Sequence, residues 1–103
     1  MKLTSVAFQN NQSIPQQFTC EGRGSNPALQ ISDVPSSAKS LVLIMDDPDT
    51  AMGVFLHWVL FNIPATTTEI KENSIPQGCL QGKNGIGKTG YIGPCPPTGE
   101  HHY

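Results

Sequence analysis

The fold of this chain is decided by the stretch Leu41-Val42-Leu43-Ile44-Met45-Asp46-Asp47-Pro48-Asp49, followed closely by Phe55-Leu56-His57-Trp58-Val59-Leu60-Phe61-Asn62-Ile63-Pro64. Residues 41–45 form a continuous apolar run of strand length, which predicts a central strand buried on both faces. Residues 55–63 predict a second, longer strand that Pro64 ends. At a strand period of two, one face of it carries Phe55, His57, Val59, Phe61 and Ile63, which would set His57 in a row of core residues.

The rest of the chain favours a mainly β fold with few or no helices. Residues 3–8 and 28–34 alternate apolar with polar side chains, as half-buried strands do. Turn signals recur about every ten residues, which is typical of an antiparallel sandwich. Residues 65–90 are polar and rich in glycine, and we expect them to run over the surface. With 103 residues, we expect a single domain over 1–103.

Composition excludes several functional classes. Six Lys and Arg stand against eight Asp and Glu, and no basic cluster is present. This argues against nucleic acid and against an electrostatic membrane anchor, since both need several cations close together. No stretch approaches the roughly twenty apolar residues of a membrane span. The first nine residues also lack the apolar core of a secretory signal, so we expect a cytoplasmic protein.

The three cysteines, Cys20, Cys79 and Cys95, give no clear pattern. Their number is odd and none are paired as CxxC, so neither a disulfide framework nor a zinc site is indicated. The sequence predicts small, partly buried thiols.

A phosphate-loop pattern, GxxxxGK[ST], is matched letter for letter by Gly82-Lys83-Asn84-Gly85-Ile86-Gly87-Lys88-Thr89. That motif works when backbone N–H groups at a helix N-terminus, directly after a buried strand, point at phosphates. Here the preceding residues are not a buried strand, and the glycines and prolines that follow disfavour a helix. We therefore predict a flexible loop, with anion contact by its N–H groups as the alternative.

Polar residues near the two apolar runs and at the end of the sequence are candidates for a site. Asp47-Pro48-Asp49 taken alone is most often a turn, and His57 taken alone is most often a core histidine. His101 and Tyr103 are two apart, so in a strand beginning there they share a face, with His102 on the other. Imidazole and phenol can both donate to phosphate-like oxygens. A metal held by His57, His101 and a carboxylate is the other interpretation, although no HxH or HxxxH spacing supports it.

Three blocks in this order resemble the phosphatidylethanolamine-binding protein family, especially its bacterial branch labelled Raf-kinase-inhibitor-like. They are residues 43–49 (LIMDDPD), residues 53–64 (GVFLHWVLFNIP) and, with Gly85, residues 87–103 (GKTGYIGPCPPTGEHHY). The resemblance runs through essentially the whole chain. It implies a sandwich of antiparallel sheets with a Greek-key connection.

The same resemblance implies a small pocket for phosphate, acetate or a phosphoryl head group. The family's pocket residues fall on Asp47, His57, His101 and Tyr103, and its rim positions on Asp49, Gly93, Pro96 and Pro97. No cofactor is implied.

The chain departs from the family pattern in three ways. Thr50-Ala51 stands where Ala-Pro usually follows the DPD motif, so a proline that stiffens the rim is absent. His102 replaces a more usual arginine. Family members also continue well beyond the position of Tyr103, so we expect a member that is incomplete at the C-terminus, lacks its last strands and has an unpaired sheet edge.

From these observations we expect a binding protein rather than an enzyme, with a kinase-inhibitor-like role implied only by the family name. Two alternatives stay open: a small ester or phosphoester hydrolase that uses an Asp–His pair, and a protein-interaction module with a vestigial pocket. A homodimer that pairs exposed sheet edges is a further expectation.

Overall fold

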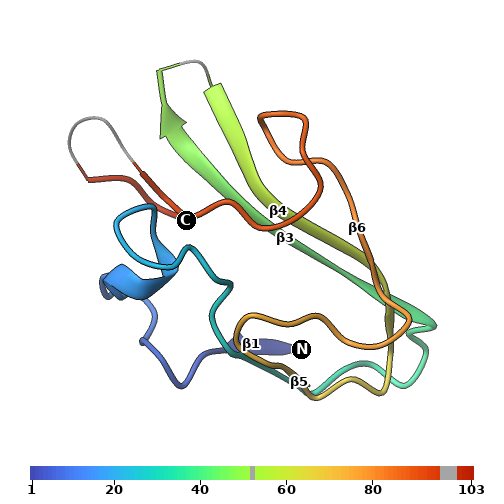
Figure 1. Cartoon of the computed structure of the whole chain (residues 1–103). Coiled ribbons are helices and arrows are strands. Elements are labelled where there is room, and N and C mark those ends of the chain that lie inside the picture. Colours follow the sequence, from blue (N-terminus) through green and yellow to red (C-terminus); the bar gives the residue numbers. More distant parts are fainter. Residues whose placement is uncertain (52, 96–99) are drawn as a thin grey trace.

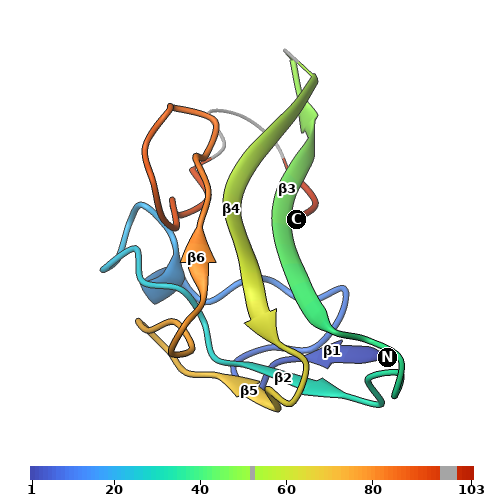
Figure 2. The ribbon, with the colours of Figure 1, turned by 90° about the vertical axis from the view of Figure 1, so that its right-hand side faces the viewer.

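The fold is seen in a computed structural model that describes residues 1–51, 53–95 and 100–103. In chain order its elements are β1 (Lys2–Thr4), a 3-10 helix (Gln16–Phe18), β2 (Leu29–Ser32), β3 (Ser40–Thr50), β4 (Gly53–Pro64), β5 (Glu69–Ile70) and β6 (Leu80–Gln81) (Figure 1). The strands form two antiparallel sheets, with orders β1-β2-β5 and β3-β4-β6. Figure 2 shows β1, β2 and β5 crossing one end of the longer sheet. The mainly β prediction is confirmed.

The long β3–β4 hairpin is irregular, and this changes which side chains face the core. The pairing shifts register between Leu41 and Leu43, between Met45 and Asp46, and between Asp47 and Thr50. Each shift breaks the strict alternation of a strand, because a bulge leaves a residue unpaired. The predicted face of alternate residues in 55–63 was therefore wrong in detail. Phe61 is exposed, whereas Trp58 and Leu60 are buried.

The core lies between the two sheets. Its buried members are Ile31, Leu41, Trp58, Leu60, Ile63, Ile70 and Cys79. Each large apolar side chain buried there stabilises the fold by about 1.5–3 kcal/mol before entropy is counted. The indole of Trp58 donates to Gln81 Oε1 at 2.9 Å and meets the ring of Tyr91 edge to face, so its polar atom is satisfied. The core thereby fixes β4 against β6.

The prediction that residues 41–45 are buried on both faces was wrong. In the described part of the chain β3 lies at the edge of its sheet. Val42 and Ile44, which point away from the core, are 63% and 57% exposed. An apolar run on an open edge strand has the same sequence signature as a central strand, so hydrophobicity alone does not separate them.

Residues 65–90 contain more structure than predicted, since β5 and β6 both fall within them. The segment that matches the phosphate-loop pattern is a tight turn closed by a bridge between Lys83 and Thr89. Asn84 is its centre: Oδ1 accepts from the N–H groups of Ile86 and Lys88, and Nδ2 donates to Gly90 O. Because these N–H groups are used within the loop, it does not form a phosphate cradle.

The expectation of three thiols was wrong for two of them. Cys20 and Cys95 form a disulfide across 75 residues, with their Cα atoms 5.5 Å apart, while Cys79 is a buried free thiol. The strand expected to begin at His101 is not formed either: residues 100–103 have no regular secondary structure. They instead return alongside β3 (Figure 1), held there by side-chain contacts described below.

Candidate functional site

Asp47 occupies the irregular end of β3, where the strand is no longer paired regularly with β4. Asp47 is 3% exposed, and both oxygens of its carboxylate accept hydrogen bonds. Oδ1 accepts from the N–H of Asp49 at 2.8 Å, and Oδ2 accepts from His101 Nδ1 at 2.6 Å. Pro48 lies between the two aspartates and needs no N–H partner at this edge position. The carboxylate is therefore fixed by the strand and in turn orients the imidazole.

His57 lies on β4 with only 5% of its surface exposed. Its Nδ1 is 2.8 Å from the carbonyl oxygen of Ile92, which can only accept, so Nδ1 carries a proton. The N–H of Ile92 donates back to the carbonyl of His57 at 2.9 Å. The ring also packs edge to face with Phe55 and with Tyr103, at centroid distances of 5.0 and 5.2 Å. These contacts fix both the tautomer and the orientation of His57.

His101 is constrained in the same way. A carboxylate accepts, so the Nδ1 facing Asp47 carries the proton. In both histidines, therefore, Nε2 gains a proton only when the ring becomes positively charged. A positively charged ring therefore adds an Nε2 donor that an anion can use.

A second pair, Asp49 with His102, fastens the same segment on the outside. Asp49 Oδ2 accepts from the backbone N–H of His102 at 2.7 Å and lies 2.6 Å from its Nδ1. The hydrogen bond from the His102 backbone, followed by that from its side chain, lowers the pKa of Asp49. The side-chain hydrogen bond and the charge of Asp49 raise the pKa of His102. Both side chains face solvent, so we treat the pair as a weak latch.

Tyr103 completes the group with its ring against His57. Burial, and then the negative charges of Asp47 and Asp49, raise the pKa of its phenol. The hydroxyl therefore stays protonated at neutral pH and remains a hydrogen-bond donor.

These residues surround one cavity of about 290 Å³. The four predicted anion ligands, Asp47, His57, His101 and Tyr103, all line it, although they come from three separate parts of the sequence. The remaining lining residues are Thr50, Ala51, Phe55, Ile92, Gly93 and Cys95. Among the described lining residues there is no lysine or arginine. We call this cavity the pocket.

Of the predicted rim residues, Gly93 lines the pocket, whereas Asp49 does not line it and instead contacts His102. A Cβ atom on Gly93 would come within 2.8 Å of Thr19 C, which explains why the position suits glycine. Pro96 and Pro97 lie outside the described residues. Sequence reasoning missed Phe55 and Cys95 as lining residues, because an aromatic in an apolar strand and a cysteine without a patterned partner give no site signal.

The described residues form neither a metal-binding cluster nor a membrane-spanning helix. Within residues 1–51, 53–95 and 100–103, no group of three or more His, Cys, Asp or Glu side chains is arranged to hold a metal ion. Over the same residues, no helix has the length and apolar character needed to cross a bilayer.

The chain is similar to proteins of one family. The family model described as phosphatidylethanolamine-binding protein matches residues 4–103. UPF0098 proteins of Methanothermobacter thermautotrophicus and Pyrococcus horikoshii are 46% and 48% identical over the whole chain, which spans 72% and 56% of their lengths. The UPF0098 protein of Aquifex aeolicus is 44% identical, and the chain spans 63% of it.

Two solved structures are also similar. One is CT736, a phosphatidylethanolamine-binding protein homologue from Chlamydia trachomatis (TM-score 0.91, 40% identity), with 96% of this chain and 67% of that chain covered. The other is YbcL of E. coli, described as a member of the mammalian family, with a TM-score of 0.90 and 31% identity over 97% of this chain and 70% of that one.

Proposed function

Because this chain belongs to the phosphatidylethanolamine-binding protein family, we propose that it is a binding module whose pocket takes a small oxyanion, either free phosphate or the phosphoryl group of a larger ligand. One observation carries the proposal: the buried Asp47–His101 pair, His57 and Tyr103 surround a single cavity. The chain spans only part of its relatives, so the proposal concerns this pocket and not the activity of a longer protein.

The pocket can bind an anion that carries a proton of its own. It can also bind a fully ionised anion when an imidazole of the pocket is protonated. Tyr103 donates its hydroxyl at neutral pH. His57 Nε2 accepts from a protonated phosphate oxygen when neutral and donates to an oxyanion when charged. With no lysine or arginine among the described lining residues, affinity rests on hydrogen bonds and on imidazole charge, so we expect weak binding at neutral pH.

The apolar part of the lining favours a ligand with an organic portion. Ala51, Phe55 and Ile92 line the same cavity as the polar groups. A phosphoryl ester or acetate fits this mixture, because its oxygens meet the polar side and its carbon atoms the apolar side. The family name agrees with a phosphoryl head group but does not identify the ligand of this chain.

Protein partners are a separate proposal. The open edge of β3, with exposed Val42 and Ile44, suits pairing with a second copy of the chain or with another protein. A kinase as the partner is suggested by family resemblance alone. A cytoplasmic location stays a prediction. An exposed disulfide is more common in oxidising compartments, although hyperthermophile cytosol is an exception.

The Asp47–His101 pair also supports a second candidate, hydrolysis of a small ester or phosphoester, since a carboxylate-oriented imidazole is a suitable general base. Cys95, which lines the pocket, is held in a disulfide and offers no nucleophile in that state. Turnover of ester and phosphoester substrates that is lost in His57→Ala and in His101→Ala would establish this function in place of simple binding.

The binding proposal is tested by sulfate titration calorimetry between about pH 5.5 and 8, because sulfate keeps its double charge over this range and any pH dependence then comes from the protein. Sulfate affinity should rise by about tenfold as the pH falls, because imidazole charge is gained. His57→Gln and His101→Gln should each remove most of this rise. His102→Gln is the matched control, since His102 contacts Asp49 outside the pocket. An affinity that does not depend on pH, or an equal effect of all three variants, contradicts the assignment.

A further inference from the structure

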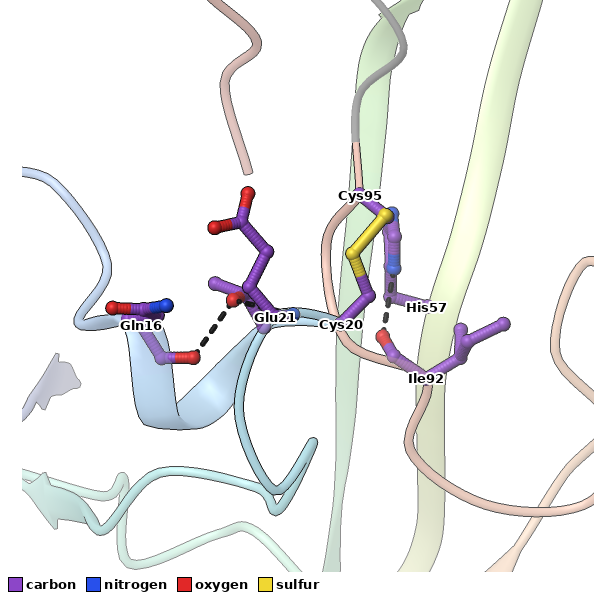
Figure 3. Close-up of a disulfide and its surroundings, with 7 residues drawn as sticks. Gln16, Cys20, Glu21, His57, Ile92 and Cys95 are labelled. Atoms are coloured by element: carbon purple, nitrogen blue, oxygen red, sulfur yellow. Dashed lines mark hydrogen bonds between the residues drawn. A yellow bond between two sulfur atoms is a disulfide. The ribbon is translucent and has the colours of Figure 1, made fainter.

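The Cys20–Cys95 disulfide forms part of the pocket's surroundings (Figure 3). Cys95 lines the cavity, and both cysteines are exposed residues. The bond joins the loop after the 3-10 helix to the segment that carries Ile92 and Gly93 along the pocket wall. A solvent-exposed disulfide is open to attack by thiolates, unlike one enclosed in a core.

The wall segment, from Ile92 to Cys95, is held by a different type of bond at each of three positions. Ile92 is held firmly, by a hydrogen bond in each direction with His57. Pro94 is held by the N–H of Cys20, which donates to its carbonyl oxygen at 3.2 Å. At Cys95 the covalent bond to Cys20 provides the attachment. Breaking that bond therefore loosens the far end of the wall first, while the Ile92 end remains tied to His57.

Residues 18–20 pack against the same wall segment. The backbone of Gly93 lies so close to residues 18–20 that an added Cβ would meet Thr19 C at 2.8 Å and Cys20 N at 3.0 Å. Three bonds hold the two segments together: the Cys20–Cys95 disulfide, the hydrogen bond from the N–H of Cys20 to Pro94 O, and that from the Tyr91 hydroxyl to Phe18 O at 2.7 Å. In the oxidised protein the wall and its support are therefore joined covalently as well as by hydrogen bonds.

We propose that Cys20 and Cys95 form a thiol–disulfide exchange site that controls anion binding in the pocket. The inference rests on the binding function proposed above. A thiolate of a dithiol reductant attacks one sulfur of the pair and releases the other cysteine as a thiolate, which takes up a proton. The second thiol of the reductant then displaces the first cysteine, so the reductant ends as a disulfide and both cysteines end as thiols.

Thermodynamic linkage makes the proposal specific. If the oxidised pair favours anion binding by a certain factor, a bound anion must favour the oxidised pair by the same factor. Sulfate should therefore make the disulfide harder to reduce, to the degree that reduction weakens sulfate binding. A disulfide that merely stabilises the fold gives a factor of one in both measurements, because neither equilibrium then affects the other.

The test compares sulfate affinity, measured by calorimetry at about pH 6, for the oxidised protein and for the protein reduced with dithiothreitol. Dithiothreitol is uncharged and does not compete for an anion pocket. We expect affinity to fall by about fivefold or more on reduction. The equilibrium constant for reduction, measured in dithiothreitol redox buffers with and without saturating sulfate, should shift by the same factor.

Variants serve as controls. The double variant Cys20→Ser with Cys95→Ser should bind sulfate with the affinity of the reduced protein, and dithiothreitol should not change that affinity. Cys79→Ala removes the buried thiol outside the pocket, and it should keep both the wild-type affinity and the response to reduction. Circular dichroism checks that the reduced protein is folded.

The outcomes separate the two proposals. Oxidised protein that binds sulfate as tightly as reduced protein overturns the exchange site and leaves the binding function standing. Reduced protein that unfolds also overturns it, because the bond then acts as a structural staple. Oxidised protein that binds no sulfate overturns both.

Discussion

The carboxylate of Asp47 and the imidazole of His101 meet at 2.6 Å although 54 residues separate them in the sequence. Asp47 is buried near the end of a long strand, and His101 belongs to a segment without regular structure. The pair therefore does two things. It fastens residues 100–103 beside β3, and it fixes which nitrogen of His101 carries a proton.

Asp47→Asn should alter the tautomer of His101. The amide oxygen can still accept from the N–H of Asp49, which leaves the amide nitrogen, a donor, facing His101 Nδ1. The proton on a neutral ring then moves to Nε2, and a positively charged ring is no longer favoured. We expect about 1–3 kcal/mol lower unfolding free energy from urea titration and about tenfold weaker sulfate binding at low pH.

Nitrogen chemical shifts of the imidazole report the tautomer directly in that variant. Asp46→Asn, one residue earlier in β3 and partly exposed, is the matched control for the loss of one negative charge. A His101 ring that keeps its proton on Nδ1 in Asp47→Asn would show that Asp47 does not set the tautomer.

The latch between Asp49 and His102 predicts a pH window. The raised pKa of His102 means that its contribution to stability is complete below the ordinary value of 6.5 and is lost as the pH rises through the folded-state value. The lowered pKa of Asp49 means that its contribution is present above 3.8 and is lost as the pH falls through the lower folded-state value. The latch is therefore most effective between these two limits.

Proton NMR titration of His102 measures this latch. The pKa of His102 should lie above 6.5 in the wild type and return toward it in Asp49→Asn. High salt should reduce the shift, because both side chains face solvent. A pKa that is the same in both proteins would mean that the ion pair does not form in solution.

How much of the fold was predictable depends on the length of each pattern. Residues 41–45 and 55–63 are long apolar runs, and both became the centres of the longest strands, β3 and β4. The shorter strands β5 and β6 were not predicted, because a strand of two residues is too short to show an alternating pattern. The faces of β4 were mispredicted because bulges shift the register, and a bulge leaves little trace in side-chain order.

The candidate site was likewise predicted only in part from the sequence. Asp47, His57, His101 and Tyr103 were named from spacing and family resemblance, and the structure brings them around one cavity, although their role in binding stays a prediction. The pairing of Cys20 with Cys95 was not predictable, because three cysteines at wide spacing leave the partner undetermined and the contact exists only once the chain has folded.

Gly93→Ala should destabilise the protein through overpacking. The added Cβ would come within 2.8 Å of Thr19 C, a backbone atom that cannot move aside as a side chain can. We expect a loss of about 1–3 kcal/mol in urea unfolding. Gly78→Ala is the comparison, because it has open space but a positive φ of 85° and so reports backbone strain alone. A loss below about 0.5 kcal/mol in Gly93→Ala would contradict the overpacking explanation.

The segment that matches the phosphate-loop pattern should behave as a structural turn. Asn84 is buried and makes three side-chain hydrogen bonds to the N–H groups of Ile86 and Lys88 and to the carbonyl of Gly90, so Asn84→Ala should cost about 2 kcal/mol of unfolding free energy. Lys88 is exposed, and Lys88→Ala should leave stability unchanged within about 0.5 kcal/mol. ATP with Mg²⁺ should not raise the melting temperature of the wild type, since the loop N–H groups already have partners. A rise in melting temperature with ATP that Lys88→Ala abolishes would instead show that the loop opens to bind phosphate.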